Sequence, residues 1–577
     1  MRREPHLLRV LLPCLMSLAC GAAGAAVALQ EQPWSIQAWG QPAAQVKGEM
    51  STDCAPAGAK AGYRFARART GGGDAEAMVP SVLVPGVAYE LTVPIRAESP
   101  ASGLGVDVYF RKDAPFYETT SIRTVQLTGQ WQTVTLKGVY DAAKPGSVRI
   151  GLRQNTGAIC LGRPALKVID PSAVAADDGL HAVSRHFFGI HLNKLGVHQG
   201  WPGFEPDVVR MWATATMWSE MQPSPGSIDW RRNIHANRLD YFVDHTARHR
   251  RDARILMTLA MTPEWASSAR SDGGACERSP FGRRTCLAPA GLDAWRDYVR
   301  QVAERFKGRI RLWEIWNEAD VPTHWVGGAA TMVEMVRVAG EEIRRVDPSS
   351  KVIGPNVTIL GLRFLNDFLA LGGGRHVDGL SIHIYMGGSP QNMFTRTRNV
   401  MELMRSHGLD LPIWNTEANT ACGAGIDGDV MLQQNLCSVK ALPAIAQGVI
   451  GTAALGVENL SYYTWEGAEQ ELGGVGLVER NFRTPTEAGV LYERLADLLR
   501  GASLKFMPPL QQGLMRVQFV KGEQRCVIAW SDGRALTVTS AALQQPTSVK
   551  TLEGRKVEAR DADGWPVSEM PILACRS

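Results

Sequence analysis

Polar and apolar positions alternate along the first third of the chain. Between residues 30 and 170 the stretches YELTVPIRAE, GLGVDVYFRK, WQTVTLKGVY and SVRIGLRQ are alternating or β-branched, with Gly, Pro and Ser between them. A period of two is typical of strands that bury one face. The pattern predicts a β-sandwich over residues 30–170, followed by a linker at 168–179.

The pattern changes after Arg185. Short apolar runs now alternate with longer stretches in which apolar residues recur every three or four positions, as in helices. Repeated strand-helix units predict a (β/α)8 barrel over residues 180–500. A doubly wound open sheet is the alternative, but no GxGxxG follows any of the runs. The eight strand candidates are residues 186–192, 207–212, 254–261, 310–317, 351–357, 377–385, 411–417 and 460–465.

Short strand patterns return in residues 501–577, for example LMRVQFV and QRCVIAWS. This segment is long enough only for a small accessory β-sandwich. The predicted fold is therefore multidomain, with a central barrel between two β-domains. The length of 577 residues agrees with several domains, and 45% hydrophobic with 21% charged residues indicates an ordinary globular protein.

The N-terminus predicts export. Arg2, Arg3 and Arg9 precede an uncharged stretch that ends in Ala26-Val27-Ala28. A basic start, an apolar middle and a small-x-small end are typical of a signal peptide over residues 1–28, and a membrane anchor is the alternative. Cys20 also allows a lipid-anchored form. We therefore expect a secreted or periplasmic protein without a transmembrane domain after signal cleavage.

The cysteine pattern agrees with an oxidising compartment. The chain has 10 cysteines, and Cys14 and Cys20 would be removed with the signal peptide. The others fall in neighbouring pairs within the proposed domains, and no CxxC or HxxxH accompanies them, so disulfides are favoured over a metal site. The predicted pairs are Cys54/Cys160, Cys276/Cys286, Cys422/Cys437 and Cys526/Cys575.

The carboxyl ends of the barrel strands carry the candidate chemistry. They combine two glutamates with amide, imidazole, phenol and indole side chains, a set that suits sugars. We find no Ser or Cys nucleophile beside a base, no phosphate-binding glycine loop and no metal-ligand motif; a lipase or protease is disfavoured because GxSxG and HExxH are absent. No metal or cofactor is expected. The residues at these ends include His191, Trp212, Asn317, Glu318, Asn356, His383, Tyr385, Glu417 and Trp465.

Two carboxyl groups across a sugar site are what glycosidic cleavage requires. Glu318 ends the fourth strand candidate and Glu417 the seventh, on opposite sides of the expected barrel mouth. Carboxyls about 5–5.5 Å apart would give a retaining mechanism, and more than about 6.5 Å an inverting one. The ionised nucleophile would raise the pKa of the acid and keep it protonated near neutrality.

The same residues carry a family resemblance. WEIWNEAD (313–320) and PIWNTEAN (412–419) resemble the acid/base and nucleophile motifs of clan A glycoside hydrolases. MTPEWA and WSEMQPSPGSIDW narrow the resemblance to family 39, which includes β-xylosidases and bacterial exopolysaccharide hydrolases. It covers about residues 185–575, and the N-terminal segment more loosely resembles jelly-roll carbohydrate-binding modules. It implies Glu318 as acid/base, Glu417 as nucleophile and Asn317 as a donor to the sugar 2-hydroxyl. The chain departs from the commoner motif at Ala319-Asp320.

The remaining candidates have a structural alternative. Arg210 either supports the nucleophile's charge or pairs with an acid, and Glu314 is expected in a buried ion pair. Further substrate-binding candidates, each also suited to core packing, are His191, Trp212, His383, Tyr385 and Trp465.

The leading hypothesis is a secreted retaining β-glycoside hydrolase that acts on a polysaccharide or oligosaccharide. A transglycosylase with the same carboxylates and a non-catalytic carbohydrate-binding or polysaccharide-export protein are the alternatives. With a net charge of only +5 and no basic run, nucleic acid is not an expected partner.

Overall fold

The structure is a computed structural model that describes residues 25–29, 33–39, 45–68, 74–99, 104–113, 118–142, 144–153, 156–177, 179–195, 200–268, 274, 276–386, 390–420, 441–466, 475–560 and 564–576. Cys20, the pair Cys422/Cys437 and most of the predicted signal peptide lie outside these ranges. The chain forms two compact units. One contains the described residues up to Asp177 together with Thr395–Gly408, and the other contains the rest, Asp178–Phe394 and Leu409–Ser577.

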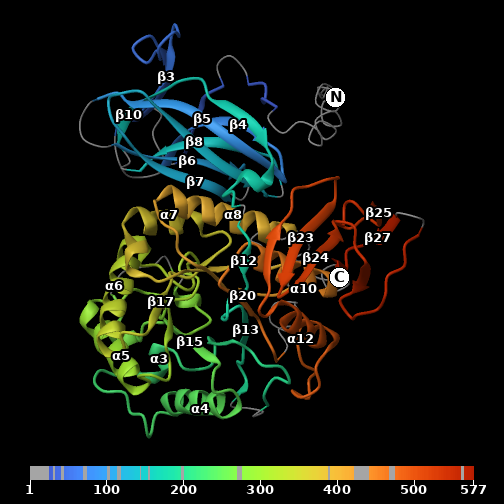
Figure 1. Ribbon diagram of the computed structural model, residues 1–577. Helices are drawn as coiled ribbons and strands as arrows, with labels where there is room; N and C mark the ends of the chain where they lie inside the picture. Colours follow the sequence, from blue (N-terminus) through green and yellow to red (C-terminus); the bar gives the residue numbers. More distant parts are fainter. Residues whose placement is uncertain are drawn as a thin grey trace, which may run out of the picture. The chain divides into compact units, whose positions relative to one another are not determined.

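The first unit contains the predicted β-sandwich. The strands of both sheets are antiparallel, as the blue and cyan ribbons of Figure 1 show. One sheet has the order β1 (Ser35–Trp39), β4 (Asp74–Leu83), β9 (Gly146–Leu152), β6 (Leu104–Lys112) and β7 (Thr119–Leu127). The other has β11 (Ala165–Ile169), β5 (Val87–Ala97), β10 (Gly157–Leu161), β3 (Gly62–Arg67) and β2 (Val46–Ser51), with β8 (Gln132–Tyr140) also paired to β5.

The alternation seen in the sequence places the sandwich core. In β5 the buried apolar positions are Leu91, Val93 and Ile95, and in β6 they are Val108 and Phe110, always two residues apart. Because successive side chains of a strand point to opposite faces, these rows meet between the two sheets.

The predicted linker at 168–179 is a packed segment. It contains the 3-10 helix η2 (Pro171–Ala173), and Val174 is fully buried against Ala88 and Val139. The backbone N–H of Ala175 donates to the carboxylate of Glu402. The boundary between the two units lies at Asp177/Asp178, inside the predicted linker, but the part of the segment before it is packed rather than extended.

Polar groups of helix α8 (Pro390–Ser406) are buried within the first unit. The side chain of Asn399, 3% exposed, accepts from the N–H of Val139 and donates to the carbonyls of Val139 and Thr120. Arg396 forms ion pairs with Glu118 and Asp141 at 2.8 and 2.7 Å. Buried polar groups need such partners, so this part of α8 and the sandwich stabilise one another.

We expect Asn399→Ala to destabilise the first unit. The substitution leaves buried main-chain groups at Val139 and Thr120 without their side-chain partner, and each such group costs about 1–3 kcal/mol. Thermal unfolding should show a transition lowered by several degrees. Arg405→Ala, at an exposed position of the same helix, is the control and should change the free energy of unfolding by less than about 0.5 kcal/mol. Equal transitions for both variants would contradict the role of Asn399.

The second unit contains the predicted barrel, and its strands are all parallel. Their order is β17, β16, β15, β14, β13, β21, β20, β19 and β18, which is sequence order around a ring. All eight strand candidates are confirmed. The bounds are β13 (Phe188–His191), β14 (Val208–Met211), β15 (Arg254–Leu259), β16 (Leu312–Ile315), β17 (Lys351–Ile353), β18 (Val357–Thr358), β19 (Leu380–His383), β20 (Ile413–Ala418) and β21 (Asn459–Tyr462).

The fifth barrel strand is divided in two. β17 and β18 are separated by Gly354-Pro355-Asn356, where Pro355 has no N–H to donate to a ladder. β17 pairs with β16, β18 pairs with β19, and a bridge from Ile353 to Gly379 joins the two sides. With β13 paired to β21, the ring closes into a (β/α)8 barrel.

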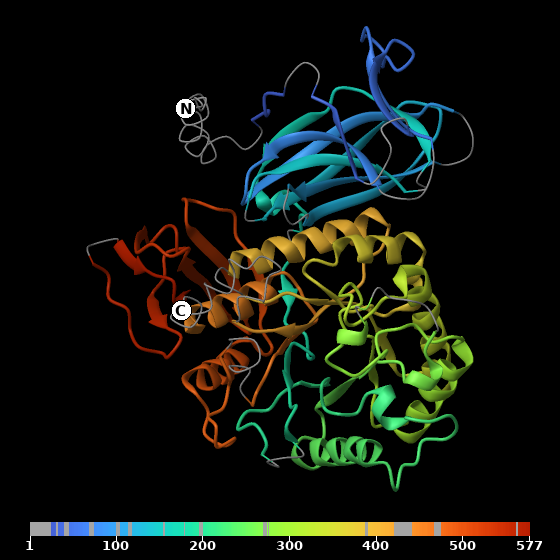
Figure 2. The same cartoon turned by 180° about the vertical axis from the view of Figure 1, so that it is seen from behind.

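Helices follow the barrel strands and lie outside them, as Figures 1 and 2 show. In α5, for example, Trp295, Tyr298, Val299 and Val302 are fully buried at helical spacing. The helices of the unit are α3 (Trp218–Met221), α4 (Ile234–His249), α5 (Leu292–Arg305), α6 (Gly328–Val346), α7 (Leu362–Ala370), α10 (Ala441–Ala454) and α12 (Glu487–Leu499), and α8 follows β19.

The C-terminal strands belong to the same unit as the barrel and lie beside α10 and α12 in both views. Their larger sheet begins with β12 (His181–Ala182), which precedes the barrel in the chain and was not predicted because it is only two residues long. The order is β12, β22 (Ser503–Phe506), β23 (Leu514–Lys521), β24 (Gln524–Ser531), β28 (Ile572–Arg576) and β26 (Ser548–Thr551), with a second sheet of β25 (Leu536–Thr539) and β27 (Gly564–Val567).

Three of the predicted disulfides are present: Cys54–Cys160, Cys276–Cys286 and Cys526–Cys575. Disulfides of this kind are typical of extracellular and periplasmic proteins. Within the described ranges, none of the helices has the length and apolar character needed to cross a membrane.

Candidate active site

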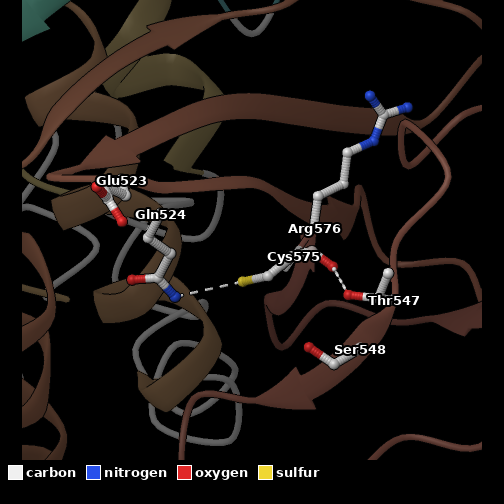
Figure 3. A pocket seen from close by; sticks show the side chains of 6 residues that line it. All are labelled: Glu523, Gln524, Thr547, Ser548, Cys575 and Arg576. Carbon is white, nitrogen blue, oxygen red and sulfur yellow. Dashed lines mark hydrogen bonds between the residues drawn. The ribbon is translucent and has the colours of Figure 1, made fainter.

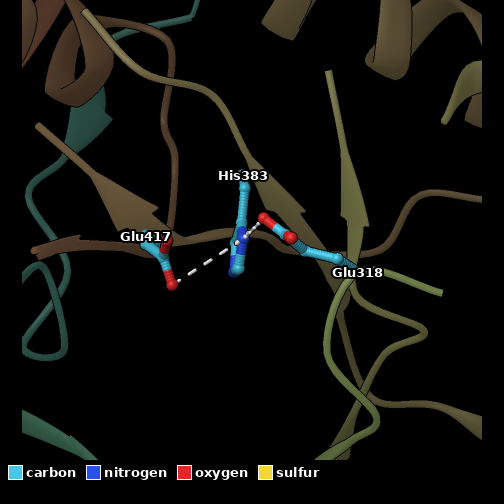
Figure 4. A group of neighbouring side chains, drawn as sticks. All are labelled: Glu318, His383 and Glu417. Atoms are coloured by element: carbon cyan, nitrogen blue, oxygen red, sulfur yellow. Dashed lines mark hydrogen bonds and ion pairs between the residues drawn. The ribbon is translucent and has the colours of Figure 1, made fainter. Parts of the chain in front are cut away.

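The candidate site lies at the carboxyl ends of β16, β19 and β20. Glu318, His383 and Glu417 converge there, with the imidazole between the carboxylates (Figure 4). Nδ1 of His383 lies 2.9 Å from Oε1 of Glu318 and 3.9 Å from Oε2 of Glu417. One carboxylate oxygen of each glutamate and one ring nitrogen lie within 4.8 Å of one another.

Local backbone irregularities aim both glutamates inward. The pairing of β20 shifts between Asn415 and Ala418, so Glu417 escapes the simple alternation of its strand. After β16, Trp316 and Glu318 have φ values of 69° and 48°, in the left-handed region that non-glycine residues rarely adopt. Such strain concentrates at functional sites, where surrounding contacts hold it.

Glu318 is held by few charged partners. Besides His383, Nε2 of His324 lies 3.5 Å from its Oε2, and its own backbone N–H donates to Oδ1 of Asn356. Burial raises the pKa of the Glu318 carboxyl, and the charges of His324 and Arg210 only partly oppose this effect.

The contacts of Glu417 stabilise its ionised form more than those of Glu318 do. Nη1 of Arg210 lies 3.1 Å from its Oε2, and the hydroxyl of Tyr385 donates to its Oε1. The pKa of Glu417 is raised as well, first by burial and also by the neighbouring Glu318, and His383, Arg210 and the phenol only partly oppose the rise. Burial lowers the pKa of His383 to about 4, so its imidazole is neutral near pH 7.

The two carboxyls therefore share their titration unequally. A hydrogen bond from a phenol and an arginine favours the ionised form of Glu417. Glu318 lacks both and faces a neutral imidazole. Because two close carboxylates do not both ionise readily, the proton of the pair belongs on Glu318.

We expect Glu318→Gln to stabilise the protein above neutral pH. The raised pKa means that the folded state binds this proton more tightly than the unfolded chain does. That stabilisation is complete below the unfolded pKa of about 4.3 and is lost as the pH rises through the folded pKa. Glutamine is neutral throughout, so the variant should unfold at a higher temperature than wild type at pH 8 and at the same temperature at pH 4.

At pH 8 the free energy of unfolding of the variant should exceed that of wild type by about 1.4 kcal/mol for each unit by which burial raises the pKa of the Glu318 carboxyl. Glu523→Gln, at an exposed position, serves as the control and should show no such pH-dependent gain. A Glu318→Gln variant that is less stable than wild type at pH 8 would show that the ionised form is the better accommodated one.

A buried polar layer lies beneath the two carboxylates. Val208, Leu256, Leu312 and Trp414 form an apolar cluster with Ile353 inside the barrel. Two residues further along the same strands, on the same face, are Arg210, Thr258, Glu314 and Thr416. The predicted buried ion pair of Glu314 is present: Nη2 of Arg210 lies 2.6 Å from its Oε2, and both side chains are fully buried.

Arg210 connects this layer to the site. Its Nη2 also donates to Oδ1 of Asn317 at 2.7 Å, and its Nη1 reaches Glu417. It thus fulfils both roles considered from the sequence, supporting the charge of Glu417 and pairing with an acid. Burial alone would raise the pKa of Glu314, but Arg210, His383 and the hydrogen bonds of Ser381 and Thr258 hold it below its ordinary value.

Asn356, one of the residues at the predicted strand ends, links Glu318 to the buried polar layer. Its Nδ2 donates to Thr416 Oγ1, Ser381 Oγ and Glu314 Oε1, while its Oδ1 accepts from the N–H of Glu318. The amide therefore ties the buried layer to the strained backbone of the candidate acid.

Three predicted binding residues are buried against protein groups. His191 is fully buried, with its Nε2 2.9 Å from the carbonyl of Thr416 and its ring edge-to-face with Tyr463. Trp212 is buried and packs against Phe281. Trp465 is 3% exposed, which leaves little ring surface for a sugar. The residues gathered around the carboxylates are Arg210, Asn317, His383 and Tyr385.

Sequence reasoning missed His324, because it lies in a loop after the barrel strand and no pattern marks it. Asp320, the departure from the family motif, accepts from the N–H of Thr358 at 2.7 Å and from its hydroxyl. It therefore ties the loop that carries Glu318 to β18. Burial raises the pKa of Asp320.

The donor atoms of Glu318, His383 and Glu417 are also close enough to surround a metal ion. Two carboxylates and an imidazole suit several divalent metals. However, the guanidinium of Arg210 occupies one face of Glu417 and the phenol of Tyr385 contacts its other oxygen. This set fits a metal poorly, since a cation would have to share Glu417 with an arginine.

A hollow of about 350 Å³ lies at the C-terminal sheet (Figure 3). It offers one acid and one guanidinium beside the Cys526–Cys575 disulfide, without a pair of carboxylates. We therefore place the candidate chemistry at the barrel. The lining residues of the hollow are Glu523, Gln524, Thr547, Ser548, Cys575 and Arg576.

No protein-family model matches the chain. Similar solved structures include a family 39 glycoside hydrolase from Bacteroides cellulosilyticus WH2, at 13% identity and a TM-score of 0.49, covering 84% of this chain and 98% of that one. A family 39 β-xylosidase from Caulobacter crescentus has 17% identity and a TM-score of 0.45, covering 69% and 97%. A family 30 subfamily 8 xylanase from Clostridium acetobutylicum has 13% identity and a TM-score of 0.45, covering 69% and 97%. The solved structures to which this chain is similar, at low sequence identity, thus include glycoside hydrolases.

Proposed function

We propose that the protein is an exported retaining glycoside hydrolase that cleaves β-glycosidic bonds in a polysaccharide or oligosaccharide. The observation that carries the proposal is the pair of carboxylates at the barrel mouth, with one oxygen of each within 4.8 Å. Retaining enzymes hold their carboxyls about 5–5.5 Å apart, whereas inverting enzymes leave about 6.5–9.5 Å for a water molecule.

The environments of the two glutamates support their division of labour. Glu417, held ionised by Arg210 and Tyr385, attacks the anomeric carbon. Glu318, protonated, gives its proton to the leaving oxygen as the glycosidic bond breaks. A water oxygen then attacks the same carbon, its proton passes to Glu318, and the ester bond to Glu417 breaks.

Asn317 supports substrate binding in this scheme. Its Oδ1 accepts from Arg210, which turns its amide nitrogen away from the guanidinium. Among the described residues this nitrogen has no hydrogen-bond partner, so it is a suitable donor for the sugar's 2-hydroxyl.

The decisive experiment is a screen of aryl β-glycosides and bacterial exopolysaccharides with wild type, Glu318→Gln and Glu417→Gln. We expect wild type to cleave at least one substrate with retention, both variants to lose that activity, and EDTA to leave it unchanged. Full activity in either variant would overturn the assignment. Glycan binding without cleavage by wild type would instead favour a non-catalytic binding protein, and products longer than the substrate would favour transglycosylation.

A further inference from the structure

Glu318 has a second imidazole at its other carboxylate oxygen. Its Oε1 faces His383, which also approaches Glu417, whereas its Oε2 faces Nε2 of His324 at 3.5 Å. His324 is fixed in place: its N–H donates to the carbonyl of Val321 and its carbonyl accepts from the indole of Trp316.

An aromatic chain continues outward from His324. The ring of Phe281 meets the imidazole edge-to-face, with centroids 4.9 Å apart, and meets Trp212 in the same manner at 5.1 Å. Trp212 is buried and Phe281 is partly exposed. Trp212 therefore packs against a ring that remains partly accessible.

A disulfide-closed loop delivers Phe281 to this position. Cys276 and Cys286 are bonded and buried with Leu287 against Val326 of the loop that carries His324. The backbone N–H of Val326 donates to the carbonyl of Cys286 at 3.1 Å. The loops after β15 and β16 are thus joined into one wall beside the candidate acid.

The chemistry of the site places the leaving group against this wall. Glu417 attacks one face of the anomeric carbon, and the leaving oxygen departs from the opposite face toward Glu318. Groups that border Glu318 therefore border the leaving group. Aromatic surfaces receive the C–H faces of sugars, and an imidazole can donate to or accept from their hydroxyls.

We propose that Phe281 and His324 form a binding subsite for a leaving group that is itself a sugar, with Trp212 as its support. The inference rests on the proposed hydrolase function and deepens it, because it names the side chains that bind the sugar on the leaving-group side. The same subsite would bind an acceptor sugar when the glycosyl-enzyme is attacked by a sugar hydroxyl in place of water. Its hydroxyl oxygen attacks the anomeric carbon, its proton passes to Glu318, and the bond to Glu417 breaks.

Reactivation of a trapped glycosyl-enzyme measures binding at this subsite separately from the formation of the glycosyl-enzyme. The trapping reagent is the 2-deoxy-2-fluoro analogue of the aryl glycoside that wild type cleaves fastest, and trapping is read as a mass increase on the peptide that contains Glu417. Xylobiose and cellobiose are then added as acceptors. We expect at least one of them to accelerate reactivation of wild type with saturation.

Phe281→Ala should lower the rate constant with the acceptor about tenfold, and His324→Ala should lower it as well. Reactivation by water should fall by a smaller factor than reactivation by the acceptor in Phe281→Ala, because water does not use the aromatic ring for binding. Phe281→Tyr should retain the acceptor effect, and Arg283→Ala, an exposed residue of the same loop, is the matched control. Because water reactivation reports an intact site, a misfolded variant is recognised directly.

The outcomes separate the two proposals. Failure of wild type to form a glycosyl-enzyme at Glu417 would contradict the retaining hydrolase itself. A glycosyl-enzyme that neither disaccharide reactivates, or equal acceptor effects in wild type and Phe281→Ala, would overturn the subsite and leave the hydrolase proposal standing.

Discussion

Glu417→Ala is expected to lower kcat by about 10⁴- to 10⁶-fold on every glycoside that wild type cleaves, the scale on which removal of a nucleophile acts. The substitution removes the group that attacks the anomeric carbon and leaves space of about the size of a carboxylate beside Arg210 and Tyr385. Azide, a small anion, should enter that space and restore turnover. Its single attack on a β-glycoside inverts the centre, so the product should be the α-glycosyl azide.

Glu318→Ala provides the complementary result. Here Glu417 still forms the glycosyl ester, and azide attacks that ester in a second displacement. The product should be the β-glycosyl azide, and substrates with an activated leaving group should suffer least because they need no proton. Glu487→Ala, at an exposed position that begins α12, is the control and should keep wild-type kcat. The same azide anomer from both variants would show that the two roles are wrongly assigned.

The barrel and the position of its carboxylates follow from local sequence pattern. Each strand candidate is a short apolar run before a helical period, and closure of eight such units places all the carboxyl ends at one mouth. The inward direction of Glu417, however, depends on the irregular pairing of β20. Strict alternation would have placed Thr416 inward and Glu417 outward, and no residue type in NTEAN announces the shift.

Other features arise from contacts between distant segments. Asn356 acts on Glu318 because the strand after Pro355 resumes beside β19, and His324 reaches Glu318 from a loop. Trp465 shows a further difficulty: a tryptophan at a strand end suits a sugar platform, yet this side chain is only 3% exposed. A sequence reports the types of side chain at a barrel mouth more reliably than it reports which of them remain accessible.

Arg210→Ala is expected to have the largest effect on both stability and pH dependence. The guanidinium is fully buried and serves Glu314, Asn317 and Glu417 together. Removing one partner of a buried ion pair costs about 3–5 kcal/mol, because the other charge remains without compensation. Thermal unfolding should therefore shift strongly. Arg210→Lys should be intermediate, since an ammonium keeps the charge but cannot reach three partners with fork geometry.

The pH profile of kcat/KM distinguishes this role from a merely structural one. Arg210 lowers the pKa of both Glu417 and Glu318, so its loss raises both. Activity requires an ionised nucleophile and a protonated acid. Both limbs of the profile should therefore move to higher pH in Arg210→Lys, and the shift should grow with the distance between the ammonium and the two carboxyls. Glu314→Gln should move the acid limb to lower pH. In this variant Glu417 no longer shares the charge of the guanidinium with Glu314. If Arg210→Lys is destabilised but keeps the wild-type acid limb, Arg210 supports the barrel interior and does not set the charge of the nucleophile.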